Sequence, residues 1–350
     1  MKKNVLLYSH ELKTGGAPAV LCEMGKILKK KYNVVVLSPS DGMMRQQFEQ
    51  NGMEVLISGE ITDELRDVIA QEFDFIVANT TLALPIVIKL AGKIPVYWWI
   101  HENTPAYEGR CGMIEYYQFA AKYAKIFSAG HVAADNFYHF YKIETEILEF
   151  GLADNYLAER DVQRHEYINV ICPSTVCELK GQDILVHAIQ KMDAGLRNKC
   201  RFIFLGDLRN DNINEYRMIE KLTEEYVNVE LHSLVQREKL LDLYYDMDVV
   251  IAPSREDATP ATIVEGLMYH KICICSSGTG VSRYLQDGKN GFVFNNENVD
   301  DLKDKLEYIV RNYEGLNQLR ERGRTVYEEV YSYDMFEKNV LERIGSMNDC

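Results

Sequence analysis

Asp257 and Glu265 lie eight residues apart in a segment that leaves an apolar run, Val249–Ala252, and continues into a helical pattern. A carboxylate accepts several hydrogen bonds, so one of the pair suits the hydroxyls of a sugar and the other suits those of a ribose. The Thr262 hydroxyl and the unpaired N–H groups at the helix start suit phosphate oxygens. The alternative is a solvated acidic turn followed by an ordinary helical glutamate.

A lysine in a second segment has the position needed to neutralise a diphosphate. Lys180 directly precedes Gly181, and both follow the apolar run Ile168–Cys172 and precede a helical pattern that begins near Gln182. An ammonium group at a helix start can lie beside an anion that the helix N-terminus also attracts. The spacing is not that of a Walker loop. The alternative is a surface lysine.

Two loops in the first half also follow apolar runs. Gly15 and Gly16 come after Val5–Ser9, and glycine there permits positive φ and a close approach of the backbone to a ligand. The dinucleotide fingerprint Gly-x-Gly-x-x-Gly is absent, which argues against an NAD-dependent dehydrogenase. His101 and Glu102 end another apolar run, where a histidine can bind sugar hydroxyls or a phosphate oxygen. A structural turn and a histidine satisfied within the fold are the alternatives.

The Asp-x-Asp spacing of Asp246 and Asp248 is one that metal-dependent sugar transferases use for a divalent ion. Here the pair directly precedes an apolar strand, and a helix end followed by a strand start explains both residues. We therefore expect no metal site.

These segments belong to two series of alternating strand and helix patterns. The expected strands of the first series are Val5–Ser9, Val34–Leu37, Glu54–Ile57, Asp74–Ala78, Val96–Ile100, Lys125–Ala129 and Glu146–Leu148. Those of the second are Ile168–Cys172, Arg201–Leu205, Val229–Leu231, Val249–Ala252 and Ile272–Cys275. Nearly continuous apolar strands separated by helices predict parallel sheets covered on both faces. The predicted fold class is α/β, with two tandem Rossmann-like, doubly wound domains.

A polar stretch, Gly151–Glu166, separates the two series. We place an N-terminal domain at 1–160, a C-terminal domain at 161–332 and a terminal helix at 333–350. Doubly wound sheets bind ligands at the carboxyl ends of their strands. Two such domains facing each other therefore predict a central cleft.

Charge and cysteine usage exclude several classes of protein. The net charge of −14 leaves no basic surplus to bind nucleic acid. The eight cysteines include no Cys-x-x-Cys pair, which indicates reduced thiols and no zinc site.

The apolar segments also bear on membranes. The N-terminal apolar run is too short for a signal peptide. The stretch Leu82–Ile100 contains Lys89, Lys93 and two prolines, so we expect a helix followed by a strand rather than a membrane span. The protein is expected to be cytoplasmic. The basic run Lys26–Lys31 is either a solvated helix end or a peripheral contact with lipid headgroups at the inner membrane face.

Taken in order, the four segments resemble glycosyltransferase family 4, the group 1 glycosyltransferases with the GT-B fold. The Gly-Gly-Ala-Pro loop is similar to the family's N-terminal glycine loop, and Ile-His-Glu is similar to the site of its histidine. Ser174–Asp183 resembles the family's Arg-Lys-Gly-Gln-Asp segment, and Ser254–Met268 resembles its Glu-x7-Glu segment. The resemblance covers nearly the full length of the chain.

The resemblance implies a retaining, metal-independent hexosyltransferase. The donor would be a nucleoside-diphosphate sugar, UDP-sugar being the first choice, which acts as a co-substrate, and no cofactor is expected. The acceptor would be a glycan or a lipid-linked oligosaccharide in surface polysaccharide biosynthesis. The last helix, near Phe336–Ile344, resembles one that crosses back onto the N-terminal domain.

The resemblance also implies roles for individual residues. His101, Lys180 and Asp257 would be catalytic, and His101 and Glu102 would contact the acceptor. The donor would be bound by Gly15, Gly16, Ser174, Lys180, Leu234, Asp257, Ala258, Thr259, Pro260, Ala261, Thr262 and Glu265. Among these, Lys180 would neutralise the diphosphate, Asp257 would bind the donor sugar and Glu265 would bind the ribose.

The sequence departs from the family pattern at the diphosphate clamp. Asp257 replaces the commoner glutamate, Ser174 replaces a usual glycine, and Thr175 or Leu179 stands where the family often has arginine. The clamp therefore rests on Lys180, with Arg255 as a candidate substitute for the arginine. A catalytically silent GT-B protein that binds a sugar nucleotide or a glycan, and a GT-B nucleotide-sugar epimerase, are the alternative functions.

Overall fold

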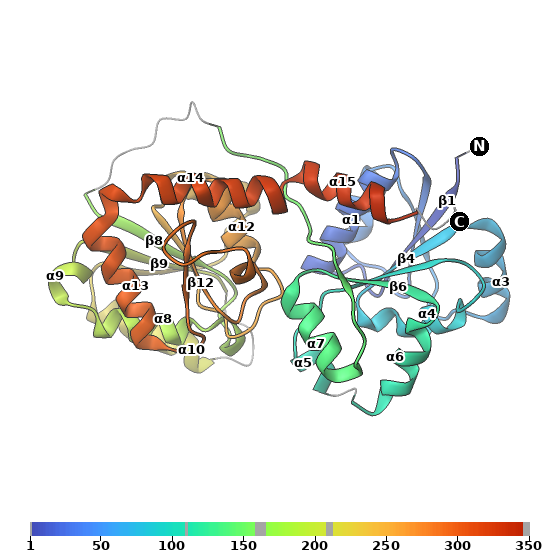
Figure 1. Ribbon diagram of the computed structural model, residues 1–350, viewed down its shortest axis with the longest axis horizontal. Coiled ribbons are helices and arrows are strands. Elements are labelled where there is room, and N and C mark those ends of the chain that lie inside the picture. Colours follow the sequence, from blue (N-terminus) through green and yellow to red (C-terminus); the bar gives the residue numbers. More distant parts are fainter. Residues whose placement is uncertain (1, 109–110, 158–165, 208–212, 346–350) are drawn as a thin grey trace. The chain divides into compact units, whose positions relative to one another are not determined.

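The computed structural model describes residues 2–108, 111–157, 166–207 and 213–345. Its internal contacts divide the chain into two compact units. Unit 1 comprises Met1–Gly151 and Tyr333–Cys350, and unit 2 comprises Leu152–Ser332. Each unit has one sheet with helices on both faces (Figure 1). The division falls at Gly151, whereas the predicted boundary at 160 and 161 lies outside the described residues.

Unit 1 contains a parallel sheet of seven strands in the order β3-β2-β1-β4-β5-β6-β7. Its strands are β1 (Asn4–Ser9), β2 (Asn33–Ser38), β3 (Glu54–Ile57), β4 (Phe75–Asn79), β5 (Val96–Ile100), β6 (Ala124–Ser128) and β7 (Glu146–Ile147). Its helices are α1 (Gly16–Leu28), α2 (Met44–Gln50), α3 (Asp63–Glu72), α4 (Leu84–Lys89), α5 (Pro105–Glu108), α6 (Ile114–Ala121), α7 (His131–Tyr141) and α15 (Tyr333–Arg343), with 3-10 turns η1 (Thr81–Ala83) and η2 (Cys111–Met113).

The C-terminal helix α15 completes unit 1 by packing on α1 (Figure 1). The ring of Phe336 stacks on Trp99 of β5 with centroids 5.8 Å apart. Arg343 donates to the Ile147 oxygen at 2.6 Å and to Glu146 Oε2 at 2.7 Å. These contacts join the last helix to the edge and to the centre of the sheet.

Unit 2 repeats the architecture with six parallel strands in the order β10-β9-β8-β11-β12-β13. Its strands are β8 (Ile168–Pro173), β9 (Cys200–Leu205), β10 (Val229–His232), β11 (Val249–Ala252), β12 (Ile272–Ser276) and β13 (Phe292–Phe294). Its helices are α8 (Gln182–Lys191), α9 (Ala194–Arg197), α10 (Ile213–Glu225), α11 (Arg237–Asp246), α12 (Ala261–Met268), α13 (Val299–Asn312) and α14 (Asn317–Val326). Short turns are η3 (Glu178–Lys180), η4 (Gly280–Arg283), η5 (Tyr313–Gly315) and the π-helical η6 (Tyr327–Tyr331).

The core of unit 2 has two layers because its strands are apolar on both faces. On β11, Val249 and Ile251 pack with α8, α10 and α13, whereas Val250 and Ala252 pack with α11 and α12. This burial explains why these strands are readable as continuous apolar runs.

The predicted fold class is confirmed, and every expected strand is present to within one residue at each end. The stretch Leu82–Ile100 is a helix followed by a strand, as expected. The prediction missed β13, because three residues carry too little periodicity to be recognised. Among the helices of the described ranges, none combines the length and the apolar character that crossing a membrane requires.

Candidate functional site

The loops after β8 and β11 meet at the carboxyl edge of the sheet in unit 2, where the strand order reverses. Ligands of doubly wound sheets bind at this position. Gly181 joins the two loops, since its φ is +67° and a Cβ there would lie 2.2 Å from the Pro253 oxygen. The Arg255 N–H also donates to the Leu179 oxygen at 2.9 Å. Glycine at 181 therefore places Lys180 against the β11 loop.

A pocket of about 320 Å³ lies between these loops. The predicted donor-binding residues in its lining are Ser174, Lys180, Leu234, Asp257, Thr259, Pro260, Ala261 and Thr262. The helix α12 begins at the pocket wall, so its first N–H groups and the positive end of its dipole are available to an anion there. The structure thus brings most of the predicted donor site together.

The two charged groups of this pocket are paired with each other. Lys180 Nζ forms an ion pair with Asp257 Oδ2, and the Asp257 side chain is only 11% exposed. The Asp257 N–H donates to the Gly278 oxygen at 3.2 Å, and the Gly280 N–H donates to the Asp257 oxygen at 2.9 Å. The loop after β12 therefore fixes the backbone that carries the carboxylate. Each charge of the pair compensates the other in a partly buried site.

Arg255 does not supply the missing arginine of the diphosphate clamp, so that suggestion is wrong. Its two terminal nitrogens donate to both carboxylate oxygens of Asp183 at 2.8 and 2.6 Å, and its Nε donates to Glu297 at 2.9 Å. The bonds to Asp183 are the main reason why the pKa of Arg255 is raised. Arg255 is absent from the pocket lining and instead joins the β8 and β11 loops.

Gln182 is a site residue that the sequence analysis missed. Its amide nitrogen donates to Ser174 Oγ at 2.7 Å and to the Thr175 oxygen at 2.9 Å. Because Ser174 Oγ accepts this bond, its hydroxyl is left to donate, and the Cys172 sulfur is one group within its reach. Gln182 is buried, and its Oε1 has no hydrogen-bond partner within the described part of the chain. A glutamine at the start of an amphipathic helix gave no signal of this role.

Glu265 is fully buried on α12 and lies outside the pocket lining. Its Oε2 accepts a bond from the Tyr244 hydroxyl at 2.7 Å, and its Oε1 is in ion-pair contact with Arg237. Burial, with a further contribution from Glu265, raises the pKa of Tyr244 well above its usual range, so Tyr244 remains a donor. The Glu265 carboxylate lies in a recognisable motif, whereas Tyr244 and Arg237 do not, so neither partner was predicted from the sequence.

Leu234 and Ala258 were also predicted to bind the donor, and of these two only Leu234 lines the pocket. Leu234 lines the pocket with 60% of its surface exposed, and its N–H donates to Asp207 Oδ1 at 2.9 Å. Ala258 lies outside the lining and contributes its carbonyl oxygen to the Thr259 hydroxyl at 2.7 Å.

In unit 1, the two glycines at the start of α1 do not adopt the left-handed backbone conformation that glycine permits. Gly15 has an extended φ of 179°, and neither Gly15 nor Gly16 has positive φ. A Cβ on Gly16 would meet no described atom within 4 Å, and one on Gly15 would meet only Pro18 Cδ, at 3.8 Å. The positive φ that glycine permits is not used here, and the fold of unit 1 does not itself require glycine; a close approach to a ligand stays a prediction.

His101 is oriented by the neighbouring strand β4. Its Nε2 lies 2.7 Å from Asn79 Oδ1, and Asn79 Nδ2 donates to the Ala17 oxygen at 2.9 Å. The second bond turns the Asn79 oxygen toward His101, so Nε2 carries the proton and Nδ1 is left as an acceptor. Burial, with a smaller effect of His10, lowers the pKa of His101 to about 3. The ring is therefore neutral at physiological pH.

The carboxylate of Glu102 is used within unit 1. Its Oε1 accepts from the Thr81 N–H at 2.5 Å and from the Thr81 hydroxyl at 2.8 Å, and its Oε2 accepts from the His101 N–H at 2.9 Å. Next to it, Thr80 has a φ of +73° and its Oγ1 lies 2.9 Å from His10 Nδ1. Glu102 thus fixes the loop that presents His101.

The Asp-x-Asp pair lies at the amino edge of the unit 2 sheet, opposite the edge that carries Lys180. Asp248 accepts from the Asn169 N–H at 2.8 Å and from the Tyr313 hydroxyl, and the Asp246 oxygen accepts from Asn169 Nδ2 at 2.8 Å. Over the described ranges, no group of three or more His, Cys, Asp or Glu side chains is arranged to hold a metal ion.

The cysteines found free and buried are Cys22, Cys172, Cys177, Cys200, Cys273 and Cys275. Cys350 lies outside the described residues.

The basic run at the end of α1 makes contacts within unit 1. Lys26 pairs with Glu23 at 2.6 Å, Lys30 pairs with Glu337, and Lys29 donates to two backbone oxygens after α2. These contacts account for three of its four lysines, and a contact with lipid stays a prediction.

Comparison with known proteins gives matches to both halves of the chain. A family model described as glycosyl-transferase family 4 matches residues 1–139, and one described as glycosyl transferases group 1 matches residues 159–326. An uncharacterized glycosyltransferase of Methanocaldococcus jannaschii is 26% identical over 147 residues, which is 41% of this chain and 39% of that protein. An uncharacterized 41.2 kDa protein of the cps region of Klebsiella pneumoniae is 26% identical over 149 residues, 43% of this chain and 38% of that protein. Each match thus spans about two fifths of the relative's length.

Solved structures match nearly the whole chain. Anabaena HepE in complex with UDP is 18% identical, with a TM-score of 0.83 over 99% of this chain and 100% of that chain. A glycosyltransferase from Rickettsia africae is 17% identical, with a TM-score of 0.78 over 97% of each chain. WaaG, a glycosyltransferase involved in lipopolysaccharide biosynthesis, is 14% identical, with a TM-score of 0.70 over 97% of this chain and 100% of that chain. These likenesses show the GT-B fold. The two family models, which match residues 1–139 and 159–326, show that the chain belongs to the group 1 glycosyltransferases of family 4.

Proposed function

We propose that the chain transfers a sugar from a UDP-sugar to a hydroxyl of a glycan or a lipid-linked oligosaccharide, with retention at the anomeric carbon and without a metal ion. HepE structures containing UDP and UDP-glucose support UDP as the donor nucleotide. The cps-region relative and WaaG support a surface polysaccharide as the product. Unit 2 would bind the donor and unit 1 the acceptor.

The observation that carries this proposal is the pocket that holds Lys180, Asp257 and the start of α12 together. A diphosphate there would lie between the Lys180 ammonium and the first N–H groups of α12. The Ser174 hydroxyl, whose oxygen already accepts from Gln182, would donate to a phosphate oxygen in place of the absent arginine. Asp257 would then accept bonds from hydroxyls of the transferred sugar.

The nucleoside would extend from this pocket toward α11. The exposed Leu234 would flank the nucleobase, and Glu265 would bind the ribose hydroxyls. For this to happen, Arg237 must leave Glu265 Oε1, which its half-exposed side chain permits, while Tyr244 keeps its bond to Oε2. A Cβ at position 16 would clash with no described atom, so the fold does not explain why this residue is glycine. The close approach of a ligand to the Gly16 backbone would explain it.

The chemistry follows from the charge that develops on the leaving group. As the bond between the anomeric carbon and the phosphate oxygen breaks, negative charge accumulates on UDP, and Lys180 and the α12 amides stabilise it. The acceptor hydroxyl forms the new bond on the same face, and its proton passes to a phosphate oxygen of UDP. Neutral His101 would accept a hydroxyl hydrogen of the sugar through Nδ1. Glu102 would act on the acceptor only through the loop that it fixes.

A thermal-shift panel of UDP-, GDP- and ADP-sugars, followed by transfer assays, tests the proposal, because a ligand stabilises the fold according to its excess over the dissociation constant. We expect UDP-sugars to raise the melting temperature and one of them to support transfer. Stabilisation without turnover on any acceptor would favour the silent binding protein. A new sugar nucleotide formed from the donor alone would favour the epimerase.

A further inference from the structure

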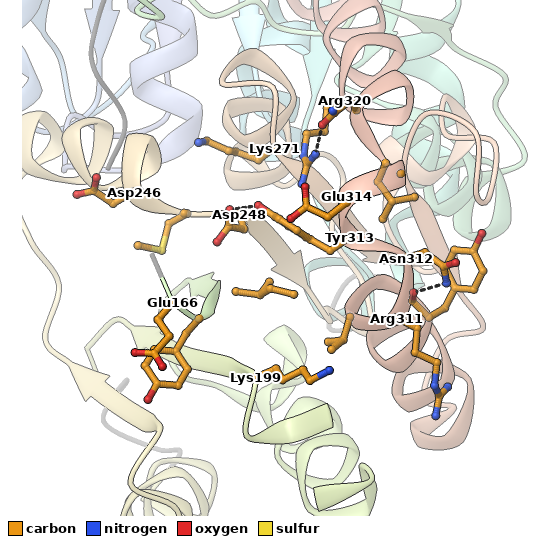
Figure 2. A pocket seen from close by; sticks show the side chains of 18 of the residues that line it. Glu166, Lys199, Asp246, Asp248, Lys271, Arg311, Asn312, Tyr313, Glu314 and Arg320 are labelled. Atoms are coloured by element: carbon orange, nitrogen blue, oxygen red, sulfur yellow. Dashed lines mark hydrogen bonds between the residues drawn. The ribbon is translucent and has the colours of Figure 1, made fainter. Parts of the chain in front are cut away.

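A second and larger pocket lies at the amino edge of the unit 2 sheet, the edge opposite the donor pocket. We name it the amino-edge pocket; it has a volume of about 1020 Å³, and its lining includes Tyr245, Asp248, Lys271, Tyr313 and Arg320. Tyr245 lies near the end of α11. Figure 2 shows the other four: Asp248 and Lys271 directly precede β11 and β12, Tyr313 follows α13, and Arg320 lies on α14. None of them belongs to the donor site.

Two cations of this pocket have no carboxylate partner. Lys271 Nζ donates to the Tyr245 oxygen at 3.0 Å, and Arg320 donates through one nitrogen to Asn317 Oδ1 at 2.6 Å. The other terminal nitrogen of Arg320 is buried and has no hydrogen-bond partner among the described residues. Within the described part of the chain, no carboxylate lies at ion-pair distance from Lys271 or Arg320. A buried cation that lacks a counter-ion is costly, so the site is suited to receive an anion.

Asp248 is the carboxylate that most favours the charged form of Lys271, and it also accepts two hydrogen bonds. Asp248 accepts the Asn169 N–H and the Tyr313 hydroxyl, and Figure 2 shows the hydrogen bond between Asp248 and Tyr313. The guanidinium of Arg320 lies 4.6 Å from the centre of the Tyr313 ring, which orients it within the pocket. Burial is the main cause that lowers the pKa of Lys271 to about 8; Arg320 lowers it further, whereas Asp248 and Asp246 oppose the effect. Asp248 thus offsets part of the cost of burying Lys271, whose ammonium donates one hydrogen bond to a backbone oxygen and keeps further N–H donors for a ligand.

The remaining lining suits hydroxyls rather than a bare inorganic ion. Tyr167 and Tyr308 are 45% and 49% exposed at this pocket, and such rings can pack against the apolar faces of a sugar. Asp248 and Asn312 supply acceptors and donors, and the volume exceeds that of a single phosphate group. We propose that the amino-edge pocket binds a phosphorylated sugar, whose phosphate lies between Lys271 and Arg320.

Isothermal titration of the full chain with glucose 6-phosphate and glucose 1-phosphate, with and without UDP, tests this proposal. At least one of them should bind more tightly than either glucose or inorganic phosphate. Lys271→Met and Arg320→Gln should each weaken that binding by about tenfold or more, the effect of losing one charge-assisted bond. Arg311→Gln is the matched control, because Arg311 lines the same pocket but pairs with Glu307 at 2.9 Å, and it should bind as the wild type does.

Two results would overturn the proposal: neither sugar phosphate binds, or both substituted proteins bind it as tightly as the wild type. Binding that is lost in Lys180→Ala would also overturn it, because the ligand would then occupy the donor pocket. Circular dichroism and the melting temperature show that each variant is folded. Sugar-phosphate binding by a chain that does not respond to UDP would support this inference and contradict the proposed function, so the two are tested separately.

Discussion

The carboxyl edges of the two sheets hold equivalent positions in the same architecture and differ in their electrostatics. In unit 1, Asn79, His101 and Glu102 satisfy one another through hydrogen bonds, and His101 is neutral. In unit 2, Lys180 and Asp257 bring opposite charges to a pocket wall. The fold therefore provides the same location in both units, and the side chains make it neutral in unit 1 and charged in unit 2, which is the difference that the proposed roles in orienting hydroxyls and stabilising a leaving group require.

Replacing Lys180 should have the largest effect on activity, because it removes the positive charge that we assign to stabilising the leaving diphosphate in unit 2. Lys180→Ala should lower the rate of transfer by at least ~100-fold, as expected for the loss of a preorganised charged donor. Steady-state kinetics with the best donor measures this. Lys191→Ala is the control, since Lys191 is an exposed lysine of α8 that pairs with Asp300, and it should retain activity. Near-wild-type turnover of Lys180→Ala would contradict the role.

The position of Lys180 can be disturbed without changing its charge. Gly181→Ala forces a side chain into the left-handed region and against the Pro253 oxygen, 2.2 Å from the new Cβ. Gly288→Ala requires the left-handed region alone, because a Cβ there meets no described atom within 4 Å. We expect Gly181→Ala to lower the free energy of unfolding by about 2 kcal/mol more than Gly288→Ala does. Urea unfolding measures both, and equal losses would show that the two loops are not tightly packed.

A substitution can introduce a charge beside His101, at the carboxyl edge of the unit 1 sheet. Asn79→Asp would place a carboxylate beside His101 Nε2 and raise the pKa of the ring, which is about 3 in the wild type. The wild-type profile of kcat/KM should therefore show no protonation of His101 above pH ~4, because His101 is neutral there. The variant should lose transfer as pH falls through the raised pKa, by about tenfold one unit below it.

Asn79→Leu removes the hydrogen bond between residue 79 and His101 without adding the charge that Asn79→Asp adds. It removes the oxygen that orients His101 and introduces no new titrating group. We expect lower activity at every pH without a new inflection. The same pH profile for Asn79→Leu and Asn79→Asp would mean that His101 does not titrate in the reaction.

The sequence predicted the sheets and most of the residues that line the pocket to which we assign the donor, because both depend on local pattern. Parallel strands buried on both faces are continuous apolar runs, and loops after β8 and β11 converge by topology alone. The partners of the site residues could not be predicted in this way. Asn79 reaches His101, and Tyr244 reaches Glu265, across 22 and 21 positions of the chain. Arg255 was misread for the same reason, since its ion pair with Asp183 depends on the packing of two loops.

Removal of divalent ions should have the smallest effect. The charge that a metal ion would supply to the leaving diphosphate is supplied in this proposal by Lys180 and α12, and Asp246 and Asp248 lie at the other edge of the sheet. We therefore expect transfer in excess EDTA to equal that in untreated enzyme, measured as initial rates after dialysis. Loss of activity that Mn²⁺ or Mg²⁺ restores would contradict this, and it would mean that Lys180 shares the stabilisation of the leaving group with a bound cation.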